Sequence, residues 1–151
     1  MRLVVLATTL IVSTSLGCNS DGVLAPPRGL EHAAAGRSCA PTDGPAVTIY
    51  LSPSAVSSPY PTPPFVELSL WRSSDELVGR WSLAASSKHG AASRIGPGGE
   101  FLESAGLGSV TVLSVQEDTT IRGNVDIIFA SGYRVRGGFT AAWISRTTIC
   151  G

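Results

Sequence analysis

Between residues 121 and 144 apolar and polar side chains alternate, and this alternation constrains the fold more than any other feature of the chain. In IRGNVDIIF, residues 121–129, the odd-numbered positions carry most of the large apolar side chains and the even-numbered positions are mostly polar. The segment YRVRGGFTAAWI, residues 133–144, repeats this pattern. Because successive side chains of a strand point to opposite faces, the pattern predicts two β-strands, each with one buried face.

The tripeptide ASG, residues 130–132, joins these two strands into a predicted hairpin. Like faces must lie together, so opposed residues have numbers with an even sum, as in Phe129 with Val135 or Val125 with Phe139. A two-residue loop would break this rule. We therefore expect a three-residue loop or a bulge, with Gly132 at a positive φ.

The rest of the chain after residue 39 carries further short runs of β-branched and aromatic residues. Strands are predicted at residues 47–51, 65–71, 77–83 and 110–115, with a weaker candidate at 93–101 that GPGG interrupts. The second hairpin is expected to pair Leu68 with Trp81 around the loop SSDE. Little or no helix is expected.

An antiparallel meander with one apolar face must bury that face. The sequence therefore predicts an all-β fold, closed as a small barrel or stacked as a β-sandwich. Glycines inside the predicted strands, at 79, 123, 137 and 138, favour the tight bends of a curled sheet. The choice between barrel and sandwich stays open at this point.

The first seventeen residues have the pattern of an export signal. Arg2 provides the positive charge, and residues 3–16 form an apolar run interrupted only by threonine and serine. A transmembrane helix needs ~20 apolar residues, so this run is too short to span a bilayer. We expect residues 1–17 to be a signal peptide that takes no part in the fold.

The junction Leu16-Gly17-Cys18 resembles the lipobox of bacterial lipoproteins, in which a small residue precedes a cysteine. This resemblance implies that Cys18 receives a diacylglyceryl thioether and becomes the mature N-terminus, and that the membrane is a partner through this anchor. Ser15 stands where that family most often has leucine, and ordinary secretory cleavage at the same bond is the alternative. Asn19 after the cysteine implies the outer membrane of a bacterial cell envelope.

Two further observations fit this resemblance. The C-terminal segment with its late Cys150 is similar to the endings of many uncharacterised bacterial lipoproteins, which implies a β fold and no known activity. Three cysteines in an exported chain leave an odd one, and lipidation of Cys18 accounts for it. Cys39 and Cys150 are then predicted to form a disulfide, the alternative being two buried free thiols.

Residues 18–38 have no sustained periodicity and contain Pro26-Pro27. They are predicted to be a flexible tether between the lipid anchor and the domain. The β domain is expected to span residues 39–151.

Catalytic and metal-binding motifs are not apparent. His89 lies in a Ser/Gly/Ala-rich loop without an acid or a cysteine at triad or ligand spacing, and no serine stands in a G-x-S-x-G motif. We expect no cofactor, no metal site and no enzyme. A cleft that joined His89 to Glu100 or Glu103 would favour catalysis.

The polar faces of the 121–144 hairpin carry Arg122, Arg134 and Arg136 against Asp126. This local excess of positive charge is a candidate surface for anionic lipid or an envelope protein. The alternative is that these arginines serve only to keep the sheet soluble. The formal net charge of the whole chain is +0, and no nucleic-acid partner is expected.

Two functions follow from these observations. The first is a lipid-anchored structural or interaction module without catalysis. The alternative is a small barrel-type binding protein for an apolar or anionic ligand, with aromatic side chains that either fill the interior or line a cavity. A cavity of ~300 Å³ inside the barrel would favour the second function. The aromatic residues concerned are Trp71, Trp81, Tyr133, Phe139 and Trp143.

Overall fold

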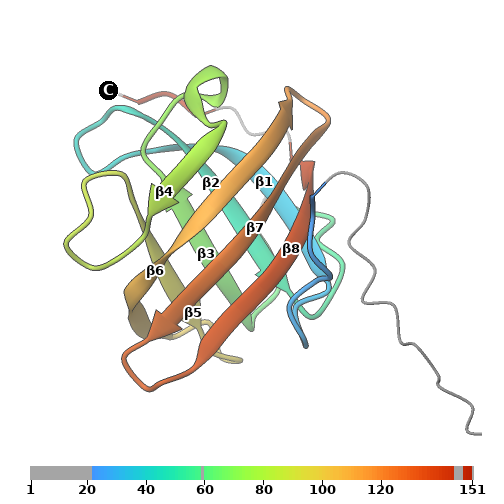
Figure 1. The fold of residues 1–151 in the computed structure, drawn as a ribbon, viewed down its shortest axis with the longest axis vertical. Coiled ribbons are helices and arrows are strands. Elements are labelled where there is room, and N and C mark those ends of the chain that lie inside the picture. The colour runs from blue at the N-terminus through green and yellow to red at the C-terminus, as the bar shows by residue number, and fades with distance from the viewer. Residues whose placement is uncertain (1–21, 59, 145–147, 151) are drawn as a thin grey trace, which may run out of the picture.

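A computed structural model describes residues 22–58, 60–144 and 148–150, and these residues form one β-sheet that closes on itself (Figure 1). The only helical element among them is a short 3-10 helix, η1 (Ser74–Glu76). The strands are β1 (His32–Cys39), β2 (Pro45–Ser52), β3 (Phe65–Leu70), β4 (Gly79–Ser82), β5 (Gly90–Ile95), β6 (Phe101–Gln116), β7 (Thr120–Phe129) and β8 (Arg134–Trp143).

Seven of these strands form a closed barrel, in the order β6, β5, β3, β2, β1, β8, β7 and back to β6. The eighth strand, β4, pairs with the second half of β6. The all-β prediction is confirmed, and the fold is a barrel, not a sandwich. The strand directions cannot alternate all the way round a ring of seven, so one neighbouring pair must be parallel. That pair is β1 with β8, and the expectation of a wholly antiparallel sheet is wrong there.

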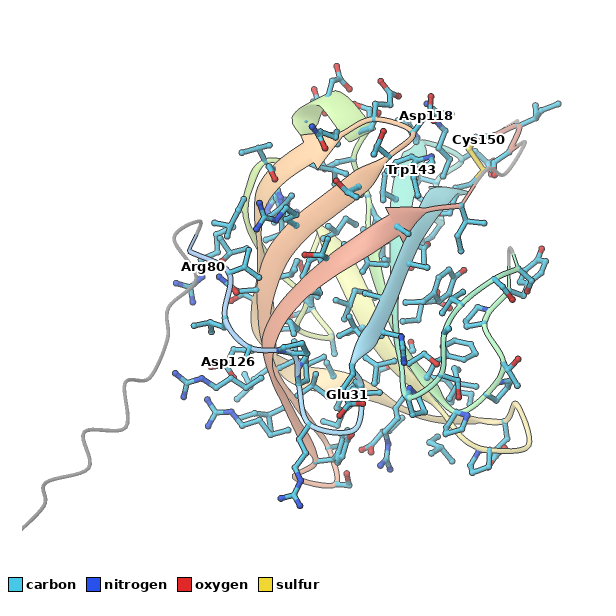
Figure 2. All side chains as sticks on the ribbon, turned by 90° about the vertical axis from the view of Figure 1, so that its right-hand side faces the viewer. Glu31, Arg80, Asp118, Asp126, Trp143 and Cys150 are labelled. Atoms are coloured by element: carbon cyan, nitrogen blue, oxygen red, sulfur yellow. A yellow bond between two sulfur atoms is a disulfide. The ribbon has the colours of Figure 1, made fainter. Side chains whose placement is uncertain are left out.

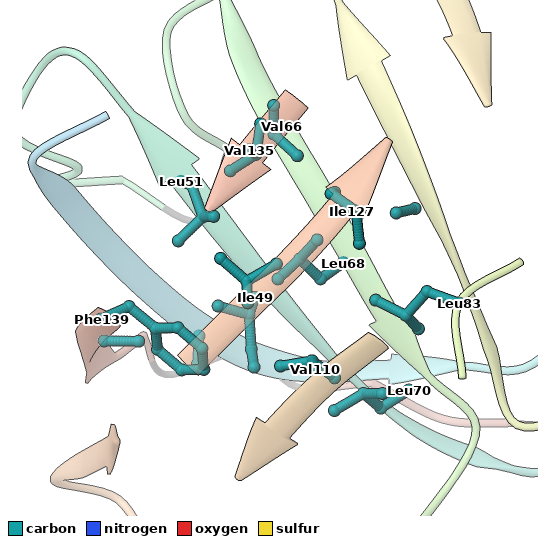
Figure 3. Close-up of a cluster of buried hydrophobic side chains, with 14 of the residues drawn as sticks. Ile49, Leu51, Val66, Leu68, Leu70, Leu83, Val110, Ile127, Val135 and Phe139 are labelled. Atoms are coloured by element: carbon teal, nitrogen blue, oxygen red, sulfur yellow. The ribbon is translucent and has the colours of Figure 1, made fainter. Parts of the chain in front are cut away.

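The apolar faces of the strands fill the interior of the barrel (Figure 3). Phe139 lies opposite Gly123 on the neighbouring strand, and a Cβ on Gly123 would come within 2.7 Å of its ring. The lack of a side chain at Gly123 thus makes room for the Phe139 side chain inside the barrel. The largest fully buried side chains are those of Val47, Ile49, Leu51, Val66, Leu68, Leu70, Leu77, Leu83, Val110, Ile121, Ile127 and Phe129.

The β7–β8 hairpin has the predicted parity and the predicted loop. The N–H of Phe129 donates to the carbonyl of Tyr133 at 2.9 Å across a three-residue loop, and Gly132 has a φ of +85°. The expected pairing of Phe129 with Val135 is wrong by two residues, because the three-residue loop places Tyr133 opposite Phe129. Val135 pairs with Ile127 instead.

The second predicted hairpin does not form. Trp81 lies opposite Val110 of β6, and Leu68 lies opposite Ala92 of β5. Strand β5 takes the place beside β3 because Gly90 allows close approach: a Cβ there would lie 2.2 Å from the carbonyl oxygen of Ser69. The weak candidate at 93–101 covers the end of β5, the GPGG turn and the start of β6.

The prediction of a flexible tether over residues 18–38 is wrong for its described part, residues 22–38. Residues 22–31, which we call the strap, lie against β7 and β8, and the chain then enters the sheet as β1. The N–H of Gly138 donates to the carbonyl of Ala25 at 2.7 Å, and a Cβ on Gly138 would lie 2.1 Å from the carbonyl oxygen of Leu24. Burial of Val23 and Leu30, each 7% exposed, holds the strap down.

The predicted disulfide between Cys39 and Cys150 is present, with a Cα–Cα distance of 5.6 Å. It joins the end of β1 to the C-terminal segment of the described chain. The predicted signal peptide and Cys18 lie outside the described residues.

Candidate functional site

The interior of the barrel is occupied by its own side chains. Phe139 belongs to the buried core, while Trp81 and Trp143 are partly buried and pack against it. Trp71 is half-buried in the segment that follows β3, and Tyr133 is exposed at the rim. Phe139, Trp81 and Trp143 therefore fill and cover the core. The candidate site is found on the outside of the barrel.

A groove of about 610 Å³ runs over the outer face of β4, β6, β7 and β8. Figure 2 labels two of its residues, Arg80 and Asp126, on the side of the barrel where the strap begins. Arg80 reaches the groove because its neighbour Trp81 points inward, and its Nε donates to Ser109 Oγ at 3.2 Å. The residues that line the groove include Arg80, Leu107, Ser109, Asp126, Ile128 and Arg134.

The register of the sheet places charged groups side by side at the centre of this face. Ser109 of β6 lies opposite Asp126 of β7, which lies opposite Arg136 of β8. Arg134 donates two hydrogen bonds to Asp126, at 2.9 and 2.8 Å, and Arg136 Nε lies 3.8 Å from Asp126 Oδ2. One carboxylate is thus shared by two guanidinium groups.

The charges fix the ionisation of this cluster. The hydrogen bond from Arg134 lowers the pKa of Asp126, and the charges of Arg134, Arg136 and Arg80 act in the same direction. The same hydrogen bond raises the pKa of Arg134. Asp126 is therefore ionised near neutral pH, and the surrounding arginines leave the face with an excess of positive charge.

Apolar side chains lie beside the arginines. Leu107 is 66% exposed and pairs across the strands with Ile128, which is 37% exposed. A β-bulge between Ala105 and Leu107 explains this, because one extra residue reverses the inward and outward sides of β6. Ala105 is buried and faces the core, whereas Leu107, two residues later, faces outward. The groove is thus both cationic and apolar.

The strap begins at the edge of this face. A smaller hollow of about 190 Å³ beside the groove is lined by Leu24, Arg80 and Arg136, among others. Asn124 of β7 fixes the strap there: its Nδ2 donates to the carbonyl of Gly22 at 2.9 Å, and its Oδ1 accepts from the N–H of Leu24 at 2.8 Å. We call the surface formed by Leu24, Arg80, Leu107, Asp126, Ile128, Arg134 and Arg136 the arginine face.

The predicted surface of three arginines is only partly brought together. Arg134 and Arg136 meet at Asp126, as described above. Arg122 also faces outward from β7, but it stands four residues from Asp126, about 13 Å along the strand, with Asn124 and the strap between them. Sequence analysis missed Arg80, which joins the cluster through the pairing of β4 with β6.

The residues whose proximity would favour catalysis lie apart. His89, next to the start of β5, has Arg72 Nη2 3.2 Å from its Nδ1, and its ring packs at a tilt against Trp81. Glu103 forms an ion pair with Arg94 near the other end of β5, at 2.7 Å. Within the described ranges, no group of three or more His, Cys, Asp or Glu side chains is placed to hold a metal ion.

Comparisons with known proteins add no relatives: the chain matches no protein-family model, no curated protein and no solved structure. None of the helical structure in the described part of the chain is long and apolar enough to cross a membrane. The structure thus defines a small closed β-barrel with a packed core and one cationic, partly apolar outer face. The proposal for its function therefore rests on the geometry of that face.

Proposed function

We propose that this protein is a lipid-anchored interaction module of the bacterial cell envelope, attached to the outer membrane through Cys18 and without a catalytic role. The observation that carries the proposal is the contrast between the filled interior and the arginine face. A barrel that holds its ligand inside needs an internal cavity. Here the polar and charged groups that face a groove lie on the outside.

The course of the strap supports an anchor close to the barrel. Gly22 is bound to Asn124 only four residues after Cys18 in the sequence. A lipid on Cys18 would therefore hold the folded domain near the membrane surface. The lipobox resemblance supplies the chemistry of that anchor, and the bound strap takes the place of a long tether.

The Cys18→Ser variant of the full chain, expressed in a bacterium that processes lipoproteins, tests the proposal. The wild-type protein should sediment with membranes and yield a lipidated N-terminal peptide by mass spectrometry. The variant should lose lipoprotein processing, and any cleaved product should move to the soluble envelope fraction. Ser20→Ala serves as the matched control because it leaves the lipobox unchanged. A Cys18→Ser protein that is processed normally and still sediments with membranes contradicts the lipid anchor.

A second candidate function is supported by a hollow of about 220 Å³ at one end of the barrel. Apolar side chains from the strap, β3 and β6, including Leu30, Phe65 and Leu102, line it together with Arg94 and Tyr133. Arg94 Nε is buried and has no hydrogen-bond partner in the described part of the chain. This arrangement suits a small apolar molecule with one anionic group.

Thermal unfolding with short-chain fatty acids tests this second candidate. Saturable stabilisation of the wild-type protein that disappears in Leu102→Ala, but not in the groove variant Leu107→Ala, supports a ligand in the hollow. No stabilisation at any concentration below micelle formation rules out this ligand class.

A further inference from the structure

We propose that the arginine face docks on the anionic phospholipid headgroups of the membrane that carries the anchor. This inference rests on the proposed function, because it assumes attachment through Cys18. It goes further by assigning an orientation: β4, β6, β7 and β8 face the bilayer, and β2 and β3 face away from it.

The bound strap keeps the anchor within a short distance of the arginine face. Gly22 stands four positions after Cys18, and an extended chain spans at most ~3.6 Å per residue, so the anchor lies within ~14 Å of the strap's first bound residue. Asn124 and Gly138 fix the strap on the outer side of β7 and β8. Figure 2 shows the strap running from near Arg80 past Asp126 toward Glu31, so the described chain begins beside the arginine face.

The arginine face carries the positive charge that an anionic headgroup requires. Arg136 and Arg134 have side chains that are 65% and 48% exposed. Arg80 lines the groove with Arg134 and the adjoining hollow with Arg136. Asp126 neutralises only part of this charge. The planar guanidinium group matches the oxygens of a phosphate in a bidentate manner, and the negative potential of an anionic leaflet attracts basic groups within a Debye length of its surface.

Apolar side chains form a rim around the arginines. Leu24, Leu107 and Ile128 are exposed around the arginines. Exposed apolar side chains next to arginines are the composition of a surface that lies in the headgroup region, where the charges meet phosphates and the aliphatic groups meet acyl chains. A site for a soluble anion gains nothing from these apolar side chains, and this favours a lipid surface.

Fluorescence quenching on reconstituted lipidated protein tests the orientation. The protein is purified from membranes and placed in vesicles of phosphatidylcholine, with or without phosphatidylglycerol, that contain a headgroup nitroxide lipid. One sample carries a fluorophore at Leu107→Cys, and a matched sample carries it at Glu67→Cys on β3. Flotation of the vesicles checks the anchor separately.

We expect several-fold stronger quenching at position 107 than at position 67, and an increase in this ratio when phosphatidylglycerol is present. Arg80→Gln/Arg136→Gln should bring the ratio close to one, while the Arg134–Asp126 pair remains. Arg37→Gln/Arg72→Gln removes the same charge from other parts of the barrel and should leave the ratio unchanged. Circular dichroism of each variant verifies that the barrel is folded.

The possible failures are distinguishable. A protein that does not float with the vesicles refutes the anchor, and with it the proposed function. A protein that floats but is quenched equally at positions 107 and 67 refutes the docking alone. A ratio that is high but insensitive to phosphatidylglycerol and to the arginine variants refutes anionic headgroups as the ligand.

Discussion

The barrel closes through two seams of very different construction. Strands β6 and β7 pair in antiparallel fashion along residues 105–116 of β6, with two interruptions of the register. Strands β8 and β1 pair in parallel at only two positions, Ala34 with Ala142 and Ala35 with Trp143. The difference follows from the odd number of strands, which forces one parallel pair into an otherwise antiparallel ring.

The short seam is reinforced by groups that are distant in sequence. The strap hydrogen-bonds to β8 through Gly138, and Leu30 joins the core close to the start of β1. The Cys39–Cys150 disulfide fastens the end of β1 to the segment that follows β8. A long ladder of strand pairing holds the β6–β7 seam, whereas the β8–β1 seam depends on the strap and the disulfide.

The largest effect is expected from removal of that bond. Cys39 and Cys150 are separated by 111 residues, and the chain-entropy model assigns ~4–5 kcal/mol to a loop of this length. Cys39→Ser/Cys150→Ser should lower the free energy of unfolding in urea by up to this amount. Reduction of the wild-type protein should give a similar loss. A loss below ~1 kcal/mol would show that the parallel seam does not depend on the disulfide.

A smaller effect is expected where the strap meets β8. A Cβ on Gly138 would lie 2.1 Å from Leu24 O and 2.6 Å from Val23 Cγ1. Gly138→Val should displace the strap and destabilise the fold by ~1–3 kcal/mol. Trypsin should then cleave after Arg28 faster than in the wild-type protein. Gly44→Ala is the control, because a Cβ at Gly44 has no atom within 4 Å. Unchanged cleavage at Arg28 contradicts this role of the strap.

Removal of the Asn124 side chain should have a more modest effect. It makes two hydrogen bonds to the strap, with Gly22 and Leu24. Asn124→Ala should cost ~1–2 kcal/mol in urea unfolding and speed up exchange of the Leu24 amide. Thr140→Ser, on the same outer face, should change neither measurement. Equal exchange rates for the Leu24 amide in Asn124→Ala and the wild-type protein would mean that the strap is held by Gly138 and its buried side chains alone.

The two seams also differ in how far the sequence predicts them. The β7–β8 hairpin beside the long seam has strong alternation and a glycine loop, so its strands, parity and turn were predicted. Strand β1, HAAAGRSC, contains small side chains and no β-branched residue. A run of alanines shows little hydrophobic periodicity, so these residues were predicted to belong to a flexible tether. Long-range pairing gives these residues their place in the sheet.

The candidate site was predicted only in part, because it too depends on long-range strand pairing. Local alternation shows that Arg134 and Arg136 share a polar face with Asp126. It does not show which strand lies beyond β7. Arg80 joins the cluster only because β4 pairs with β6, and Leu107 faces outward only because of a bulge. The sequence pattern predicts which side of each strand faces solvent. Which strands become neighbours, and where bulges occur, depends on how the whole barrel closes.

The smallest effect is expected at Glu103, which binds the β7–β8 loop to β6 and so supports the long seam. Ser131 donates to Glu103 through its N–H at 2.8 Å and its hydroxyl at 2.7 Å. These two hydrogen bonds lower the pKa of Glu103, with a further contribution from the charge of Arg94. The folded state therefore binds this proton less readily than the unfolded state. The resulting stabilisation is present above the ordinary pKa of 4.5 and is lost as the pH falls through the folded-state value.

Glu103→Gln should consequently flatten the acid limb of the stability curve. The difference in unfolding free energy between the wild-type protein and the variant should be greatest near neutral pH and should shrink as the pH falls below the ordinary pKa of 4.5 toward the lowered folded-state pKa. Urea titrations at a series of pH values measure it, with Glu76→Gln at the exposed end of η1 as the matched control. A difference that stays constant with pH would mean that Glu103 holds the loop by its shape and not by its charge.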